Sequence, residues 1–525
     1  MGVGSLFRLA RAGFILAREG AFSLVQPERL PTLPRTAILI GRRFERRRVA
    51  RKDQAERLTA ALNKLGPSWV KLGQFLATRP DLVGTEAADG LGHLRDEIPP
   101  FPLEEARSVV RRSFGRPVEA LYASFSEPVA AASIAQVHRA EVVGADGVTR
   151  RMAVKVMRPG IRRRLDRDLA TFFAGARLIE RIDRNARRLK PVAVVDRLAR
   201  SVMLEMDLRL EAAALSEVAE NARNDEGFRV PKVDWQRSDR DVLTLEWIDG
   251  IKMSDVAALR AAGHELSVLA QRLMQIFLRH ALRDGFFHAD LHQGNLFVDP
   301  AGNIVAVDYG IMGRLSHAER RFLAEILYGF VKRDYRRIAE VHREAGYVPA
   351  RHSIDDFAQA LRAIGEPIHG QSARDISMAR VLTQLLEVTE MFDMETRTEL
   401  ILLQKTMMVV EGVARSLDPD FDMWSTSEPI LTEWVARHMG PLGLVDEALA
   451  GAQWLRRLVG VLPELGERAG DITRSIAETS RRGFRLDPDT VAQIAEATAS
   501  RTRSERFALM VGVAALVGIL IALVA

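Results

Sequence analysis

The spacing of apolar residues along the chain changes from a helical pattern to an alternating one and then back. Apolar positions over 58–94 recur at helical spacing, with breaks at Gly66-Pro67 and near residues 79–81. The helical pattern continues over 103–114. The chain before Pro128 is therefore predicted to be mostly helix.

A short alternating stretch then predicts a small β-sheet. Polar and apolar residues alternate over 130–142, and the segment 152–156, Met-Ala-Val-Lys-Val, follows the turn sequence Gly-Ala-Asp-Gly at 144–147. Two alternating runs that flank a Gly-rich turn are typical of a β-hairpin. We expect this hairpin to form part of a small lobe.

Beyond the hairpin the pattern predicts two long helices, two short strands and a mostly helical second lobe. The helices and strands are expected, in order, at residues 161–188, 194–223, 229–234 and 242–247. The small lobe ends at 246–250, and the second lobe runs from there to about residue 424. This order of elements indicates an α+β protein with two lobes.

The two ends of the chain have different apolar patterns. Residues 507–525 carry no charge, and at ~1.5 Å per residue they reach the thickness of a bilayer core, so they predict one transmembrane helix rather than a buried one. Arg501, Arg503 and Arg506 precede this span and place the rest of the chain in the cytoplasm. Residues 1–20 predict a basic amphipathic helix and lack the apolar core of a secretory signal.

Composition and charge exclude some kinds of chemistry. Among the 525 residues there is no cysteine, which excludes disulfides, thiolate catalysis and cysteine-ligated zinc. The net charge is +6, and seven basic residues lie between Arg42 and Lys52. This cluster suits anionic lipid or plain solvation; no aromatic interleaving or nucleic-acid motif accompanies it, so we expect no nucleic-acid partner.

Three polar residues in the second lobe have the spacing that kinases use to hold metal-bound phosphates. Asp290 and Asn295 have four residues between them, and Asp308 follows the apolar run 304–307 just before Gly310. We expect Asp290 to approach the acceptor hydroxyl or orient a water, Asn295 to bind a metal, and Asp308 to bridge that metal to phosphate oxygens. Oxygen donors suit Mg²⁺, so ATP and Mg²⁺ are predicted. His288 and His292 are predicted to fix this loop.

A lysine and a helical group of carboxylates in the small lobe complete the expected phosphate site. Lys155 lies in an Ala-Val-Lys-Val strand, where a kinase holds the α- and β-phosphates. A carboxylate from Glu205, Asp207 or Glu211 is expected to position it. The loop over the phosphates is expected at Ala130, Ala131, Ala132, Ser133, Ile134, Ala135, Gln136 and Val137, where alanine replaces the usual glycine.

Taken in order, these residues resemble the UbiB family of atypical, protein-kinase-like kinases of ubiquinone biosynthesis. Residues 71–74 match its KxGQ motif, and 130–133 match its alanine-rich loop. Residues 205–207 match its ExD motif, and segments at 405–406 and 411–420 look like its C-lobe signature. The resemblance covers roughly residues 55–425. Leu291 and Gln293 stand where the family usually has proline, and one terminal span is counted where bacterial members often have two.

The resemblance implies a bilobal protein-kinase-like fold in which the KxGQ helix packs over the active site. Lys71 and Gln74 would meet the ExD carboxylates and limit protein phosphorylation, which favours ATP hydrolysis or a lipid-like acceptor. The implied function is a kinase or ATPase anchored in the inner membrane that acts on or presents quinone precursors, with membrane lipids and other ubiquinone-biosynthesis enzymes as partners. A conventional protein or small-molecule kinase and a nucleotide-binding scaffold without catalysis are the alternatives.

These inferences divide the chain into six expected regions. They are a basic N-terminal segment, a helical extension with the KxGQ motif, a kinase-like N-lobe, a kinase-like C-lobe, a helical linker and a membrane anchor, at residues 1–54, 55–127, 128–249, 250–425, 426–506 and 507–525.

Overall fold

The computed structural model describes residues 3–21, 39–45, 54–77, 90–91, 99–182, 190–370, 384, 387–388, 391–394 and 398–438. Residues up to Glu428 belong to one compact unit, which holds every element of the site discussed below. The break expected at 79–81, most of the expected linker and the expected span at 507–525 lie outside the described residues. Within the described part, no helix is both long and apolar enough to cross a bilayer.

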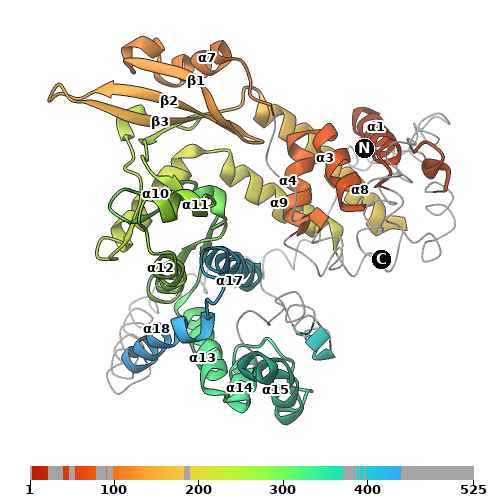
Figure 1. Ribbon diagram of the computed structural model, residues 1–525. Helices are drawn as coiled ribbons and strands as arrows, with labels where there is room; N and C mark the ends of the chain where they lie inside the picture. Colours follow the sequence, from red (N-terminus) through yellow and green to blue (C-terminus); the bar gives the residue numbers. More distant parts are fainter. Residues whose placement is uncertain are drawn as a thin grey trace, which may run out of the picture. The chain divides into compact units, whose positions relative to one another are not determined.

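The described chain begins with three helices, α1 (Val3–Arg18), α3 (Gln54–Leu65) and α4 (Pro67–Ala77) (Figure 1). The expected break at Gly66-Pro67 is confirmed: Gly66 has a φ of +101°, which favours glycine, and proline begins the next helix. The amphipathic N-terminal helix is confirmed as well. Its buried face, with Leu9 and Leu16, packs within the protein, where α1 contacts α3 and α8 (Ile161–Ile182).

The N-lobe contains an antiparallel sheet in the order β1-β2-β3-β5. Its strands are β1 (Ser124–Ala131), β2 (Ala135–Val143), β3 (Thr149–Met157) and β5 (Val242–Glu246). Helix α7 (Leu103–Phe114) covers one face of this sheet, where Val154 and Val156 are fully buried in a common apolar core (Figure 1). The expected hairpin over 130–156 is therefore confirmed.

The chain before Pro128 was expected to be mostly helix, but strand β1 already begins at Ser124. It pairs with β2 at the edge of the sheet, and the register shifts on both sides of Pro128. Proline has no N–H to give to a ladder, and an edge strand with a bulge tolerates it. Pro128 thus interrupts the register rather than ending a helix.

A second correction concerns the long helix expected over 194–223. The structure has two helices there, α9 (Pro191–Glu205) and α10 (Leu208–Asn221), on either side of Met206 and Asp207. Asp207 is the N-cap of α10, and its side chain accepts a hydrogen bond from the backbone N–H of Arg209 at 3.1 Å. Cap formation turns the chain and places Glu205 and Glu211 on different helices.

The C-lobe is mostly helical, as expected, and surrounds short strands. One sheet has the order β4-β9-β8-β6, and β7 pairs with β10. The strands are β4 (Phe228–Arg229), β6 (Ile251–Lys252), β7 (Phe286–His288), β8 (Leu296–Val298), β9 (Ile304–Ala306) and β10 (Met312–Arg314). The segment expected as a strand over 229–234 contributes only β4, which pairs in parallel with β9 of this lobe.

Helices cover these strands and extend the lobe (Figure 1). They are α11 (Val256–Ala261), α12 (Leu266–Arg279), α13 (His317–Lys332), α14 (Tyr335–Glu344), α15 (Ile354–Gly370), α17 (Thr398–Leu417) and α18 (Met423–His438). Helix α12 packs against α17 and continues into a π-helical turn, His280–Asp284, that leads to β7. Gly285 ends this turn at φ +65°, and a Cβ there would lie 2.6 Å from the Leu315 carbonyl oxygen.

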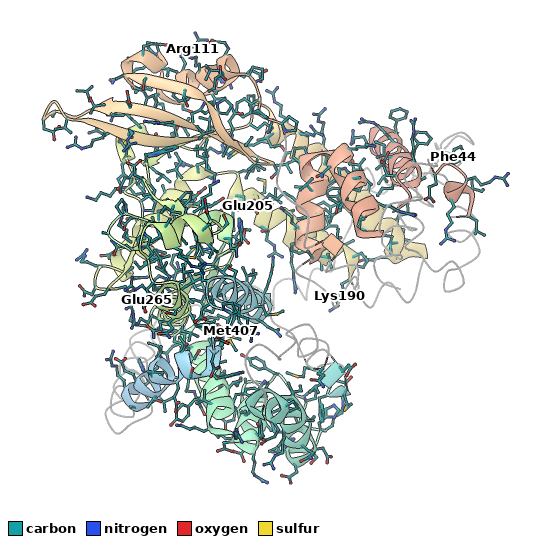
Figure 2. The ribbon with its side chains drawn as sticks, viewed as in Figure 1. Phe44, Arg111, Lys190, Glu205, Glu265 and Met407 are labelled. Carbon is teal, nitrogen blue, oxygen red and sulfur yellow. The ribbon has the colours of Figure 1, made fainter. Side chains whose placement is uncertain are left out.

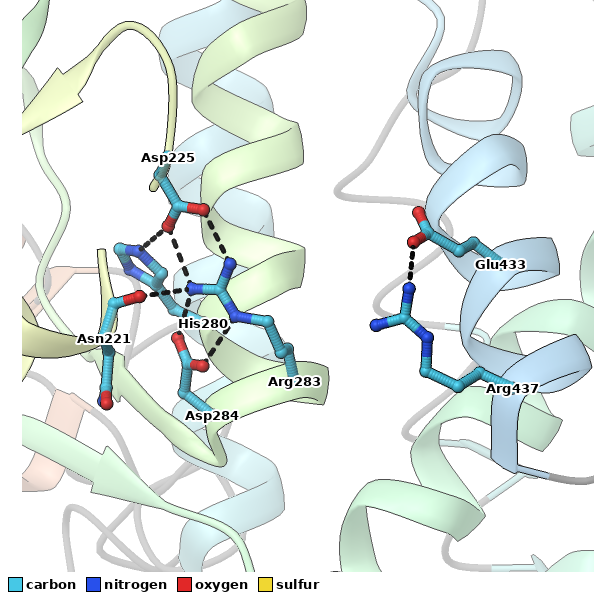
Figure 3. A network of polar contacts seen from close by, with 7 residues as sticks. All are labelled: Asn221, Asp225, His280, Arg283, Asp284, Glu433 and Arg437. Atoms are coloured by element: carbon cyan, nitrogen blue, oxygen red, sulfur yellow. Dashed lines mark hydrogen bonds and ion pairs between the residues drawn. The ribbon is translucent and has the colours of Figure 1, made fainter. Parts of the chain in front are cut away.

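A buried polar network joins the end of α10 to the π-helical turn (Figure 3). Both Asp225 oxygens accept hydrogen bonds from Arg283, at 2.6 and 2.9 Å, and His280 Nε2 lies 3.2 Å from Asp225 Oδ2. Arg283 also donates to Asp284 and to the Asn221 carbonyl at 3.1 Å. Burial opposes the charge of Asp225, but His280 and Arg283 outweigh it and hold the pKa of Asp225 well below its usual range. The network fixes α10 to the C-lobe.

We expect Asp225→Ala to lower the free energy of unfolding by about 3–5 kcal/mol, because it leaves Arg283 and His280 without their buried partner. The matched control is Glu433→Ala, which breaks the ion pair with Arg437 at 2.7 Å, where both side chains are about two-thirds exposed. That change should cost about 0.5 kcal/mol or less. Urea unfolding of both variants measures the difference, and equal losses would contradict the role given to Asp225.

Candidate active site

Lys155 occupies the centre of the site, between carboxylates from two other segments. Its Nζ lies 2.8 and 2.9 Å from the two carboxylate oxygens of Glu211 and 3.2 Å from Oδ1 of Asp308. The lysine and Glu211 side chains are nearly buried, whereas 47% of the Asp308 side chain is exposed. The contacts of Lys155 therefore join β3, α10 and the segment after β9. The Asp308 carboxylate stays accessible to a ligand.

The alternation of β3 explains why Lys155 faces the site. Val154 and Val156 lie in the core beneath α7, so Lys155 between them points to the opposite face of the sheet. Val137 on β2 is its cross-strand neighbour and shares that face. Ala130 on β1 is in turn opposite Val137. These residues form the strand surface around the lysine.

Asn295 and Asp308 come together because they flank one antiparallel hairpin. Asn295 directly precedes β8 and Asp308 follows β9 by one residue, and Leu296 pairs with Ala306 between them. The Val307 amide donates to the Asn295 carbonyl at 3.0 Å. The pair offers one amide and one carboxylate oxygen donor, which suits a hard cation whose other ligands are water and phosphate. In the part of the chain that the structure describes, no group of three or more His, Asp or Glu residues is placed to ligate a metal.

The loop that carries Asp290 is held by its two histidines, as expected. The Asp290 amide donates to His288 Nδ1 at 3.0 Å, and the Gly294 amide donates to His292 Nδ1 at 3.0 Å. Asn295 Nδ2 donates to the Asp290 carbonyl at 3.3 Å, which closes the loop. The Asp290 side chain remains 38% exposed. Its carboxylate is thus presented to solvent on a backbone that is tied at both ends.

Gln293 makes a contact that the sequence did not signal. Its Nε2 donates to Ser416 Oγ at 2.6 Å, and Ser416 Oγ donates to the Val413 carbonyl at 2.7 Å within α17. This side chain therefore ties the loop to α17. Gln293 and Ser416 are 123 positions apart in the sequence, so this role of Gln293 becomes visible only in the folded structure.

The alanine-rich segment ends strand β1 at Ala131 and leads into the tight turn before β2. The Ala132 amide donates to the Ala135 carbonyl at 2.8 Å, and Ser133 in this turn is fully buried. Gln136 differs from the role expected for it: its Oε1 accepts from the Phe101 amide at 2.9 Å, and its Nε2 donates to the Phe101 carbonyl at 3.2 Å. The Gln136 side chain is on the α7 side of the sheet and anchors the chain before α7.

The KxGQ helix, α4, is joined to α9 by a nearly buried ion pair. Lys71 Nζ lies 2.7 Å from Glu205 Oε2, and both side chains are about 10% exposed. Glu205, labelled in Figure 2, is the last residue of α9. Gln74 lies one turn further along α4. Of the three carboxylates considered for Lys155, Glu211 contacts it, Glu205 binds Lys71, and Asp207 caps α10 and binds Arg209.

The charges of the site control each other's ionisation. Burial opposes the ammonium of Lys155, but Asp308 and Glu211 outweigh it and raise the pKa of Lys155. Burial likewise opposes ionisation of Asp308, while Lys155 and the Gly310 amide hold its pKa well below its usual range. Burial raises the pKa of Glu211 to about 7, against the effect of Lys155. Burial also lowers the pKa of His288.

A buried lysine bound by a helix carboxylate, a loop with Asp and Asn, and an Asp-Tyr-Gly segment after a strand define a kinase-like protein with a sheet-containing N-lobe and a helical C-lobe. Family comparisons agree. Residues 93–342 match the ABC1 atypical kinase-like domain, and 361–422 match the UbiB helical domain. A probable protein kinase UbiB of Marinobacter nauticus is 37% identical over 98% of this chain and 94% of that protein.

This chain therefore belongs to the UbiB family of atypical kinases, and it is an enzyme of that class. The structure of the Rv3197–erythromycin complex from Mycobacterium tuberculosis matches 71% of this chain and 94% of that one at 25% identity and a TM-score of 0.47.

The raised pKa of Glu211 predicts a pH-dependent effect of Glu211→Gln. The folded wild type keeps a proton on Glu211 up to about pH 7, while the unfolded chain loses it near its ordinary value of 4.5. Wild-type stability therefore decreases as pH rises through this window, by about 3 kcal/mol at most, and the glutamine variant escapes this loss.

Urea unfolding of nucleotide-free protein at pH 5 and pH 7.5 measures the effect. The variant should gain stability relative to wild type at the higher pH. Glu217→Gln, at an exposed position of the same helix, is the matched control. A Glu211→Gln difference that does not change with pH would show that the carboxylate is ionised throughout.

Proposed function

We propose that this enzyme uses ATP with Mg²⁺ to transfer or hydrolyse the terminal phosphoryl group, in support of ubiquinone biosynthesis. The observation that carries the proposal is the contact of Lys155 with both Glu211 and Asp308. A cation held between two carboxylates, one nearly buried and one open, is arranged to exchange the open partner for phosphate oxygens. Membership of the UbiB family supports the link to ubiquinone.

Lys155 and Glu211 perform the positioning part of this reaction. Glu211 holds the Lys155 ammonium with two short contacts, and its carboxylate also accepts a hydrogen bond from the Tyr309 amide. The ammonium is therefore fixed in direction before nucleotide arrives, which avoids reorganisation during transfer. From there it is placed to bind the α- and β-phosphates.

The divalent cation would be held by Asn295 and Asp308, at the end of the β8–β9 hairpin. Mg²⁺ supplies charge neutralisation for the β- and γ-phosphates when it is bound. The low pKa of Asp308 supports this assignment, because an ionised carboxylate is ready as a ligand at any physiological pH. The amide of Asn295 adds a second oxygen without adding charge.

Asp290 is placed to act on the acceptor. Its carboxylate is partly exposed, and its backbone is fixed by His288 and Asn295. It would accept a hydrogen bond from an acceptor hydroxyl or from a water, and so orient that oxygen toward the γ-phosphate. Water as the acceptor gives ATP hydrolysis, and an alcohol or phenol gives a phosphorylated product.

The ion pair between Lys71 and Glu205 supports a small or lipid-like acceptor rather than a protein. It holds α4 to α9 with little solvent around it, and in the family this helix lies where a protein kinase admits a peptide. Breaking such a buried pair costs about 3–5 kcal/mol. A protein acceptor, as the name of the Marinobacter relative suggests, would have to displace α4 against that cost.

We place the catalytic region at the cytoplasmic side of the inner membrane, anchored by residues 507–525. This segment is uncharged and long enough to span the hydrocarbon core, and three arginines precede it. Quinone precursors with isoprenoid tails reside in the same bilayer. The anchor would bring the site to them and to the other enzymes of the pathway.

Asp308→Asn and Asp290→Asn should each reduce ATP turnover at least about a hundredfold, because each removes a charge that acts directly on the reacting groups. Turnover by purified full-length protein measures the effect, and unfolding midpoints verify that the variants fold. Asp146→Asn, in the exposed turn before β3, is the matched control and should stay within about twofold of wild type. Undiminished turnover in Asp308→Asn would overturn the assignment of ATP chemistry to this site.

Quinone content tests whether catalysis serves the pathway. In a strain that lacks the gene, the wild-type chain should restore ubiquinone, and the Asp308→Asn chain, expressed to the same level, should not. The physical reason is that the asparagine side chain lacks the negative charge with which Asp308 would hold the cation of the nucleotide. Restoration by both chains would instead indicate a nucleotide-binding scaffold.

A further inference from the structure

A second cavity lies among the N-terminal helices, separate from the site around Lys155. It has a volume of about 400 Å³ and opens between α1, the α3–α4 junction and α8. Four arginines line it: Arg8, Arg11, Arg164 and Arg167. Its size is within the range of small-molecule pockets. Neither the nucleotide chemistry nor the family assignment accounts for it.

Two of these arginines, Arg8 and Arg164, are held by contacts between elements. Arg8 Nε on α1 donates to Thr171 Oγ1 on α8 at 2.9 Å, and Thr171 is fully buried. Arg164 Nη2 on α8 donates to the Leu65 carbonyl at 3.1 Å, at the end of α3. Gly66 permits that approach, because a Cβ at this position would lie 2.0 Å from Arg164 Nη2. The guanidinium groups thus converge from two helices.

Among the described residues that line the cavity, Asp168 is the single carboxylate beside Arg11, Arg164 and Arg167. It lies 4.0 Å from Arg164 Nε, and its Oδ2 accepts a hydrogen bond from Ser68 Oγ at 2.6 Å. Guanidinium forks match phosphate oxygens in geometry, and several forks around one cavity bind polyvalent anions strongly. We propose that this cavity is a binding site for a phosphoryl anion.

The walls of the cavity indicate that the anion carries an organic group. Trp69 lines it and packs edge-on to Phe172, with ring centroids 4.8 Å apart. Phe7 and Phe14 lie on α1, one turn to either side of Arg11, and are 74% and 50% exposed. A phosphate ester in solution and the head group of an anionic lipid share the chemistry recognised here. The exposed rings of Phe7 and Phe14 could contact the acyl chains of a lipid but not a soluble phosphate ester, so their substitution distinguishes the two ligands.

Full-length protein in an uncharged detergent tests the proposal by calorimetric titration. A saturating Mg-ATP analogue keeps the nucleotide site occupied, and the probes are glycerol 3-phosphate and dihexanoyl phosphatidylglycerol. We expect saturable binding of at least one probe that weakens as salt rises. Arg164→Gln and Arg167→Gln should each weaken it about tenfold or more. Arg177→Gln, at an exposed position of the same helix, should stay within about twofold.

The two probes separate the possible sources of the anion. Equal affinity for both probes indicates a soluble phosphate ester, and preference for the lipid that is lost in Phe7→Ser indicates a head group. Unfolding midpoints verify each variant, and Arg11→Gln, at an exposed position, replaces any variant that does not fold. No saturable binding of either probe, or equal binding by wild type and the cavity variants, would refute the site.

Discussion

The arrangement of both lobes depends on one buried cation, Lys155, and on the carboxylates that hold it. A lysine ammonium on the inner face of a sheet is unfavourable unless opposite charge accompanies it. Asp308 from the C-lobe provides that charge at 3.2 Å, and Glu211 from α10 binds the ammonium at 2.8 Å and adds its own charge once it ionises at about pH 7. These two contacts stabilise the buried ammonium. They also bring β3, α10 and the segment after β9 together in the geometry of a phosphate site.

Helix α10 connects the lysine site to the C-lobe. Its N-terminus begins at the Asp207 cap, which turns the chain so that Glu211 faces the lysine. Past its C-terminal end, Asp225 binds Arg283 and His280 of the C-lobe. A helix that is capped at one end and followed by a buried network at the other has little freedom to rotate. The position of Glu211, and with it the direction of Lys155, is consequently set by contacts at both ends of the helix.

Basic residues serve different purposes in the two parts of this molecule. Lys155 and Lys71 are nearly buried, and each forms an ion pair with a carboxylate of the same chain. Among the described residues that line the N-terminal cavity, the arginines outnumber the one carboxylate, and Arg164 and Arg167 donate to the backbone carbonyls of Leu65 and Arg163. Hydrogen bonds to neutral acceptors orient a guanidinium without cancelling its charge. Such a group remains able to attract an anion.

The sequence by itself determined the class of fold and the break at Gly66-Pro67, and it predicted Lys155, Asp290, Asn295 and Asp308 as the candidates for phosphate chemistry. These are local features, because strand alternation, loop spacing and a glycine next to proline act over a few residues. The tertiary structure alone decided which carboxylate holds Lys155, that Gln136 anchors Phe101, and that Gln293 reaches Ser416. It also gathered the four arginines of the cavity. These pairings join residues far apart in the chain, and their energies come from burial and charge at the contact, which periodicity along the sequence does not encode.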